Sequence, residues 1–116
     1  VTDTENGFTL EKDGKTLVKV IWLNKDGDQG RGRDIELWEN DMLYYIEVKS
    51  TKTEEKDWFD VSRDQWALMQ EKGDKFFIYR VYGAGTRKPP PPLKIRNPAR
   101  LWLEGSINAY PVRIHL

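Results

Sequence analysis

The sequence predicts a mixed α/β (α+β) domain, in which a mixed β-sheet flanked by helices begins with an N-terminal β-hairpin. Three observations lead to this prediction. Asp13-Gly14 and Asn40-Asp41 each separate two β-prone runs, as hairpin turns do. Residues 62–73 carry the start and stop signals of a helix. The aromatic run 75–82 after this helix again has the composition of a β-strand. Strands therefore stand on both sides of the helix, which indicates that they share one domain with it.

The chain length predicts a single domain. The 116 residues lie in the usual range for one domain, so we expect residues 1–116 to form one unit. Residues 1–7 are polar, and we expect them to be disordered. The chain begins with Val rather than Met, so we expect it to be a fragment of a larger protein.

The composition limits the kinds of site and partner. There is no cysteine and one histidine, His115, which excludes disulfides and zinc sites built on Cys or His clusters. A bound metal would meet mainly carboxylates, which suits Mg²⁺, Mn²⁺ or Ca²⁺. A formal net charge of zero argues against binding nucleic acid through overall charge, but permits a local basic patch. The sequence contains no bilayer-spanning apolar run and no signal-peptide pattern, so we expect an intracellular protein, cytoplasmic or nuclear, without a membrane partner.

The first predicted hairpin runs from Phe8 to Leu23. One strand covers Phe8 to Lys12, Asp13-Gly14 form the turn, and the second strand continues from Lys15. The polar, glycine-rich residues 24–33 are expected to form a loop.

The second predicted hairpin has a register that follows from its turn. If Asn40 and Asp41 form the turn, Glu39 faces Met42 and Asp34 faces Glu47. A four-residue loop keeps this register, whereas a three-residue loop shifts it.

The register sorts the side chains onto two faces. One face is apolar and is expected to be the core: Ile35, Leu37, Tyr44, Ile46 and Val48. The other face is mostly charged: Asp34, Glu36, Tyr45, Glu47 and Lys49. Opposed like charges destabilise a sheet, so the pair Asp34 and Glu47 is unfavourable unless a cation lies between them.

The strongest helix signal begins at Ser62. Ser62 can cap the helix, Gln65 can complete a capping box, and Gly73 is a natural stop. We expect a short strand before it at residues 58–61, and a central strand after it at residues 75–82.

The last third of the chain is less regular. Four successive prolines at 89–92 favour polyproline II, so no regular element is expected over residues 83–94. A short helix follows Asn97, which can cap it with Pro98 in its first turn. Residues 107–116 are expected to form a final edge strand.

The charged face of the second hairpin suggests a metal site. Asp34 and Glu47 would form a two-carboxylate cup for Mg²⁺ or Mn²⁺, with Lys49 two residues further along the same face. Such a site can place a water molecule and stabilise charge on a phosphodiester.

These residues resemble a known superfamily. The pattern D-x(12)-E-V-K, formed by Asp34, Glu47 and Lys49, is similar to the site of PD-(D/E)XK nucleases, with Arg33 where that superfamily usually has Pro. More narrowly, the stretch "VIWLNKDGDQGRGRDIELWENDMLYYIEVKST" resembles the C-terminal domain of NO VEIN-type proteins. The later stretches "SRDQWALMQEKGDKFFIYRVYG" and "IRNPARLWLEG" extend this resemblance to about Gly105.

The resemblance implies a restriction-endonuclease-like fold and a role for each of four residues. Asp34 and Glu47 would hold the metal, Lys49 would be the catalytic lysine, and Gln65 would support the site. The sequence departs from the superfamily in one respect. An acid usually comes from a helix before the first core strand, whereas this region reads as a hairpin in which neither Glu5 nor Glu11 matches.

Two functions therefore remain open. One is a metal-dependent nuclease acting on nucleic acid, with DNA favoured over RNA. The other is a non-catalytic recognition or interaction module, attached to an ATPase or helicase within a larger protein. Expected nucleic-acid contacts are Arg31, Arg33, Lys52, Arg87 and Lys88, although ordinary surface charge explains them equally well. Other domains of the larger protein and a second copy are the remaining expected partners.

Overall fold

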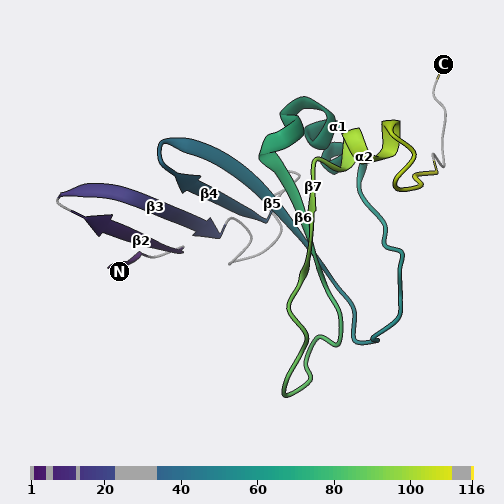
Figure 1. Ribbon diagram of the computed structural model, residues 1–116, viewed down its shortest axis with the longest axis horizontal. Helices are drawn as coiled ribbons and strands as arrows, with labels where there is room; N and C mark the ends of the chain where they lie inside the picture. The colour runs from purple at the N-terminus through teal and green to yellow at the C-terminus, as the bar shows by residue number, and fades with distance from the viewer. Residues whose placement is uncertain (1, 5–6, 13, 23–33, 111–115) are drawn as a thin grey trace.

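The structure is a computed structural model that describes residues 2–4, 7–12, 14–22, 34–110 and 116. It contains one seven-stranded sheet and two α-helices (Figure 1). The strands are β1 (Thr2–Thr4), β2 (Gly7–Lys12), β3 (Lys15–Trp22), β4 (Ile35–Glu39), β5 (Met42–Ser50), β6 (Phe76–Val81) and β7 (Leu93–Arg96). The helices are α1 (Arg63–Lys72) and α2 (Pro98–Leu103), with a 3₁₀ turn at Gly73–Lys75.

The strands lie in the sheet in chain order. Every neighbouring pair is antiparallel except β5 and β6, which are parallel and joined through α1. This single parallel pair makes the sheet mixed, as predicted. A parallel connection needs a crossover, and residues 51–75 supply it.

The predicted register of the second hairpin is confirmed. Glu39 pairs with Met42, and Ile35 pairs with Ile46. Asn40 and Asp41 both have positive φ angles, of 50° and 65°, as the two central residues of a type I′ turn require. Asn and Asp tolerate this left-handed conformation better than other non-glycine residues, so the turn residues determine the register.

Both helices begin as the sequence predicts. Ser62 and Gln65 form the complete capping box of α1, and the chain turns away at Gly73. The side chain of Asn97 accepts a hydrogen bond from the backbone N–H of Arg100, so Asn97 is the N-cap of α2. The two helices lie side by side at one end of β5–β7, where Trp66 meets Trp102 edge to face at 5.5 Å (Figure 1).

The position of the core corrects the prediction. The buried cluster of Met69, Phe76 and Ile78 joins α1 to β6 on the face that also carries Tyr45 and Glu47. The helices therefore cover the face that was expected to be charged. The opposite face, which we call the apolar face, carries Ile35, Leu37, Tyr44, Ile46 and Val48, and no described helix covers it. Ile46 on this face is buried as predicted, whereas the other four are only partly buried. Alternation alone could separate the two faces but could not show which one the helices cover.

Several local predictions differ from the structure. Thr2–Thr4 form strand β1 against β2, although residues 1–7 were expected to be disordered. Residues 58–61 and 107–110 are not strands, and Leu93–Arg96 form β7 where no regular element was expected. β7 forms because β6 offers an unpaired edge, a tertiary cause that local composition does not reveal. The predicted loop 24–33, Leu23, Glu5 and His115 lie outside the described residues.

Candidate active site

Glu47 lies in the middle of β5, opposite Ile78 of the parallel strand β6. It points to the helix-covered face, and only 5% of the residue is exposed. A carboxylate in such a place needs polar partners, because burying an unpaired charge costs several kcal/mol.

Gln65 supplies one of these partners from the first turn of α1. Its Nε2 donates a hydrogen bond to Oε1 of Glu47 at 2.7 Å. Its Oε1 accepts one from Nζ of Lys49 at 3.0 Å and another from the backbone N–H of Ser62 at 2.8 Å. The same amide therefore completes the capping box and joins the helix to both charged residues of β5. The capping role and the predicted supporting role of Gln65 are therefore compatible.

Lys49 lies two residues from Glu47 on the same face. Its Nζ is 3.5 Å from Oε1 of Glu47, and its side chain is 18% exposed. The ammonium group therefore partly neutralises the buried carboxylate while keeping some contact with solvent. Strand β5 is rich in Tyr, Ile and Val, yet it accommodates the charged side chains of Glu47 and Lys49. It can do so because each of the two contacts the other and Gln65.

Asp34 stands directly before β4 and completes the site. Its backbone N–H donates to the carbonyl of Ile46 at 3.0 Å, and Ile46 is also the partner of Ile35, so Asp34 is fixed at the end of the β4–β5 pairing. Its Oδ2 accepts a hydrogen bond from the backbone N–H of Val48 at 2.8 Å. The register of the structure ends at Ile35 and Ile46, so the predicted direct pairing of Asp34 with Glu47 is not part of it. The charge of Asp34 still raises the pKa of Glu47, so the two carboxyls are close.

The environment raises the pKa of Glu47 to about 7, from an ordinary value of 4.5. Burial is the largest cause, because it disfavours the charged form, and the neighbouring charge of Asp34 is the second. Lys49 opposes both effects but does not cancel them. Near neutral pH the Glu47 carboxyl is therefore close to half protonated.

Arg80 is a part of this region that the sequence did not reveal. It lies in β6 opposite Lys49, and only 2% of it is exposed. Its guanidinium donates to the carbonyls of Lys49, Lys56 and Trp58 at 3.3, 2.7 and 3.2 Å. Arg80 therefore fixes the end of β5 and the following loop. The sequence does contain a signal for a buried arginine at this position: Arg80 is the one charged residue in the aromatic strand "FFIYRVY".

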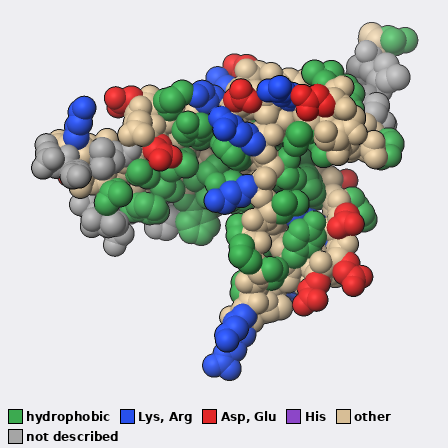
Figure 2. All heavy atoms as spheres, in the orientation of Figure 1, with side chains coloured by type: hydrophobic (Ala, Val, Ile, Leu, Met, Phe, Trp, Pro, Cys, Tyr) green, Lys and Arg blue, Asp and Glu red, His purple; other side chains and the backbone are tan. Residues whose placement is uncertain are grey.

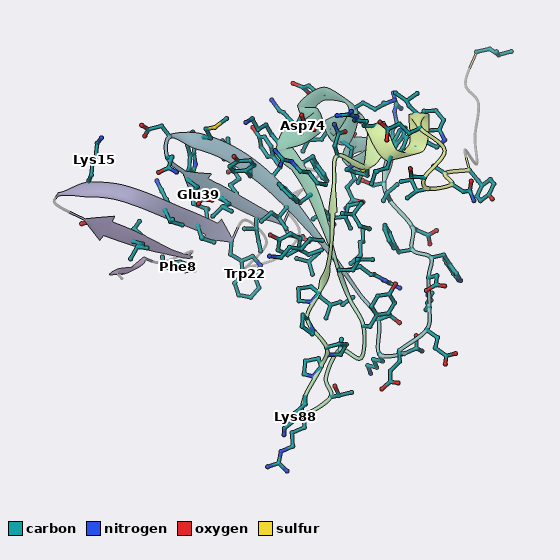
Figure 3. The ribbon with its side chains drawn as sticks, viewed as in Figure 1. Phe8, Lys15, Trp22, Glu39, Asp74 and Lys88 are labelled. Carbon is teal, nitrogen blue, oxygen red and sulfur yellow. The ribbon has the colours of Figure 1, made fainter. Side chains whose placement is uncertain are left out.

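Three of the predicted nucleic-acid contacts lie within the described residues, all in exposed loops. Arg87 and Lys88 are exposed in the loop between β6 and β7, and Lys88 points away from the sheet and both helices (Figure 3). Lys52 is exposed just after β5. Arg31 and Arg33 lie outside the described residues.

The donor set suits a hard divalent cation. Asp34 and Glu47 are close enough for their charges and a hydrogen bond between them to raise the pKa of Glu47. A cation beside these two carboxylates would favour the ionised form of Glu47. Within the described ranges no group of three or more His, Cys, Asp or Glu side chains could hold a metal. Water or phosphate oxygens would have to complete the coordination, as is usual for Mg²⁺.

Comparison with known proteins identifies the class of domain that carries this site. The family model "Protein NO VEIN, C-terminal" matches residues 5–95, which is most of the chain. The chain therefore belongs to the family of NO VEIN C-terminal domains, as the resemblance implies.

Two relatives from Arabidopsis thaliana are similar to the chain. Protein NO VEIN is 29% identical over 102 residues, which cover 86% of this chain and 4% of that protein. Protein NO VEIN-LIKE is 34% identical over 76 residues, which cover 64% of this chain and 11% of that protein. The chain thus spans a small part of the length of each relative. No solved structure matches it. No helix in the described part of the chain is both long and apolar enough to cross a membrane.

Proposed function

We propose that this is a nuclease-like domain that binds nucleic acid and, where active, hydrolyses phosphodiesters with Mg²⁺ or Mn²⁺. One observation supports this proposal above all others. Glu47 is buried with a pKa near 7, beside Asp34, in a network with Lys49 and Gln65. Strongly perturbed carboxyls held among charged partners are common at functional sites. We also propose that the fold is restriction-endonuclease-like and that the domain belongs to the PD-(D/E)XK superfamily.

Each residue of the site has a proposed role. Asp34 and Glu47 would hold the divalent cation, which when bound would supply positive charge to the phosphate and lower the pKa of a water ligand. Lys49, whose Nζ is fixed by Gln65, would orient the attacking water and stabilise negative charge that develops on the phosphate. Gln65 is a positioning residue, because it acts through Lys49 and Glu47.

The proposed polymer is nucleic acid, with DNA favoured over RNA. Exposed cations within the described part of the chain, such as Lys52, Arg87 and Lys88, would contact its phosphates. Lys52 lies in the loop after β5, and Arg87 and Lys88 lie in the loop after β6; hydrogen bonds join these two loops. Because few cations are involved, we expect weak binding that falls with salt.

A cleavage assay tests the proposal. Supercoiled plasmid, linear duplex, single-stranded DNA and RNA are each incubated with Mn²⁺ or Mg²⁺. The wild type is compared with the double variant Asp34→Asn, Glu47→Gln. The control is Glu39→Gln, which removes an exposed carboxylate of β4 on the apolar face. Cleavage by the wild type and control, but not by the double variant, would support the proposal. Equal cleavage by all three would contradict it and indicate a contaminating nuclease.

A second candidate function is supported by the small number of carboxylates at the site. Asp34 and Glu47 are two carboxylates, and the third acid that such nucleases usually carry is not among the described residues. A non-catalytic module that recognises nucleic acid or a partner domain, attached to an ATPase or helicase, would not need it. Calorimetric titration with Mn²⁺ separates the two candidates. The nuclease requires binding that the double variant loses, whereas the recognition module predicts a gel shift without metal binding or cleavage.

A further inference from the structure

The apolar face is much larger than the part of it on β4 and β5. Strand pairing extends it to Phe8 and Leu10 of β2 and Trp22 of β3, and to Phe77 and Tyr79 of β6. Ile46 at the centre of this face is buried, whereas Phe8, Leu10, Trp22 and Met42 on it are exposed, with Trp22 at 51%. Trp22 projects from the end of β3 away from both helices (Figure 3). An apolar sheet face is ordinarily buried against a second layer, and both described helices lie on the opposite face.

Cations border this face on its β6–β7 side. Lys75, Lys94 and Arg96 each lie over an aromatic ring, those of Tyr44, Tyr79 and Phe77, at 5.1, 5.5 and 5.5 Å from the ring centres. Figure 2 shows Lys and Arg side chains next to hydrophobic ones in the middle of the view, where the sheet runs from β4 to β7. Glu39 is also on this face, beside Met42. Its described border is therefore predominantly basic.

We propose that the apolar face is a docking surface for an amphipathic, acidic α-helix of a partner protein. One end of the apolar side of such a helix would cover the exposed Phe8, Leu10 and Trp22 on β2 and β3. Carboxylates towards its other end would meet Lys75, Lys94 and Arg96 at β6 and β7. Neighbouring strands lie about 4.8 Å apart, so the face from β2 to β7 is about 24 Å wide. An α-helix of about 16–20 residues lying across the strands would span it.

Two other occupants fit less well. Single-stranded nucleic acid stacks its bases on open aromatic faces. Here the rings of Tyr44, Phe77 and Tyr79 meet edge to face and are partly covered by cations. A second copy would bring its own basic border, so the pairing of two such faces would desolvate cations of both. The acidic helix satisfies the apolar surface and the cations together.

Fluorescence anisotropy with synthetic peptides tests the proposal. The probe is a labelled helical peptide of about 20 residues with Leu along one side and Glu on its flanks. A second peptide has Lys in place of every Glu. We expect the wild-type chain to bind the acidic peptide at least tenfold more tightly than the basic one. Absence of binding, or equal binding of both peptides, would overturn the proposal.

Matched variants locate the binding surface. We expect Trp22→Glu, and separately Lys75→Glu with Lys94→Glu, to weaken acidic-peptide binding at least tenfold. Trp38→Glu and Lys19→Glu are the controls, because these exposed residues pair with each other across β3 and β4 on the opposite face. Circular dichroism and urea unfolding establish that each variant is folded. The same loss of binding in the controls would overturn the proposal.

Two further measurements distinguish the partner helix from nucleic acid and from a second copy of the chain. Binding of a labelled single-stranded oligonucleotide that Trp22→Glu abolishes would reassign the face to nucleic acid. A dimer in sedimentation velocity that Trp22→Glu dissociates would reassign it to a second copy. Absence of both effects, together with selective binding of the acidic peptide, supports the partner helix. The proposal does not depend on the nuclease-like function, because the two sites lie on opposite faces of the sheet.

Discussion

Gln65 donates a hydrogen bond to Glu47 at 2.7 Å, although 18 positions separate them in the chain. The same side chain closes the capping box of α1 through Ser62. The start of a helix and the charged centre of a strand are thus held by one amide. Four predictions follow from this network and from the residues around it.

Replacement of Gln65 by Glu separates its two roles. Glu also completes a capping box, so α1 keeps its start. It cannot donate a hydrogen bond to Glu47, and it adds a third carboxylate beside Asp34 and Glu47. We expect Gln65→Glu to lower the free energy of unfolding by about 1–2 kcal/mol at pH 8 and by less at pH 5, where Glu47 is protonated.

Urea unfolding at both pH values measures this effect. The control is Gln70→Glu, which makes the same substitution at an exposed position of α1. An equal loss in both variants would show that the carboxylates do not interact with residue 65.

The raised pKa of Glu47 makes stability depend on pH. In the unfolded chain Glu47 ionises near 4.5, and in the folded protein near 7. The folded state therefore holds its proton more tightly between these values. The resulting stabilisation is fully present below pH 4.5 and is lost as pH rises through 7. We expect Glu47 alone to lower the free energy of unfolding by about 3 kcal/mol across this window.

Glu47→Gln measures this contribution directly. A neutral amide cannot ionise, so the variant should lose less stability than the wild type between pH 4.5 and 8 when both are unfolded in urea with EDTA. Parallel pH profiles for the two proteins would show that Glu47 does not carry the effect.

Divalent cations should stabilise the protein more at high pH. A proton on Glu47 competes with a cation, so we expect Mg²⁺ or Mn²⁺ to raise Tm more at pH 8 than at pH 5.5. At a cation concentration of about 100 times Kd, the gain is about 2.7 kcal/mol. Thermal unfolding with and without EDTA checks this, with Ca²⁺ as a comparison. The double variant Asp34→Asn, Glu47→Gln should show no shift, and a shift that survives in it would place the cation elsewhere.

Replacement of Arg80 by Lys should destabilise the protein although the charge is kept. The guanidinium reaches three carbonyls from a planar fork, whereas a single ammonium cannot reproduce that geometry. Because Arg80 is almost fully buried, we expect a loss of about 2–4 kcal/mol in the free energy of unfolding. Arg63→Lys, at an exposed position of α1, is the control and should change it by less than about 0.5 kcal/mol. Similar stability of Arg80→Lys and the wild type would show that the carbonyl contacts contribute little.

Local chemistry predicted much of this fold correctly. The two hairpins, the register around Asn40 and Asp41, and the caps at Ser62 and Asn97 were all predictable, because each depends on residues close together in the chain. The predicted alternation put Lys49 on the face of Glu47, and the effect of Asp34 on the pKa of Glu47 shows that Asp34 is near. Strands β7 and β1 were not predicted, because each forms by pairing with the edge of a neighbouring strand. The roles of the site, the nucleic acid and the partners remain predictions.

The sequence by itself determined the elements, the pairing of the second hairpin and the residues that share a face, because turn chemistry and alternation act over a few residues. Only the tertiary structure decided which face the helices cover. Met69 of α1 packs on Phe76 and Ile78, on the face that carries the buried Glu47, whereas Leu37 and Val48 on the other face are only partly buried. This placement of the helices raises the pKa of Glu47 and leaves the apolar face with no described helix over it. Both results follow from packing between residues far apart in the chain, which alternation within a strand does not specify.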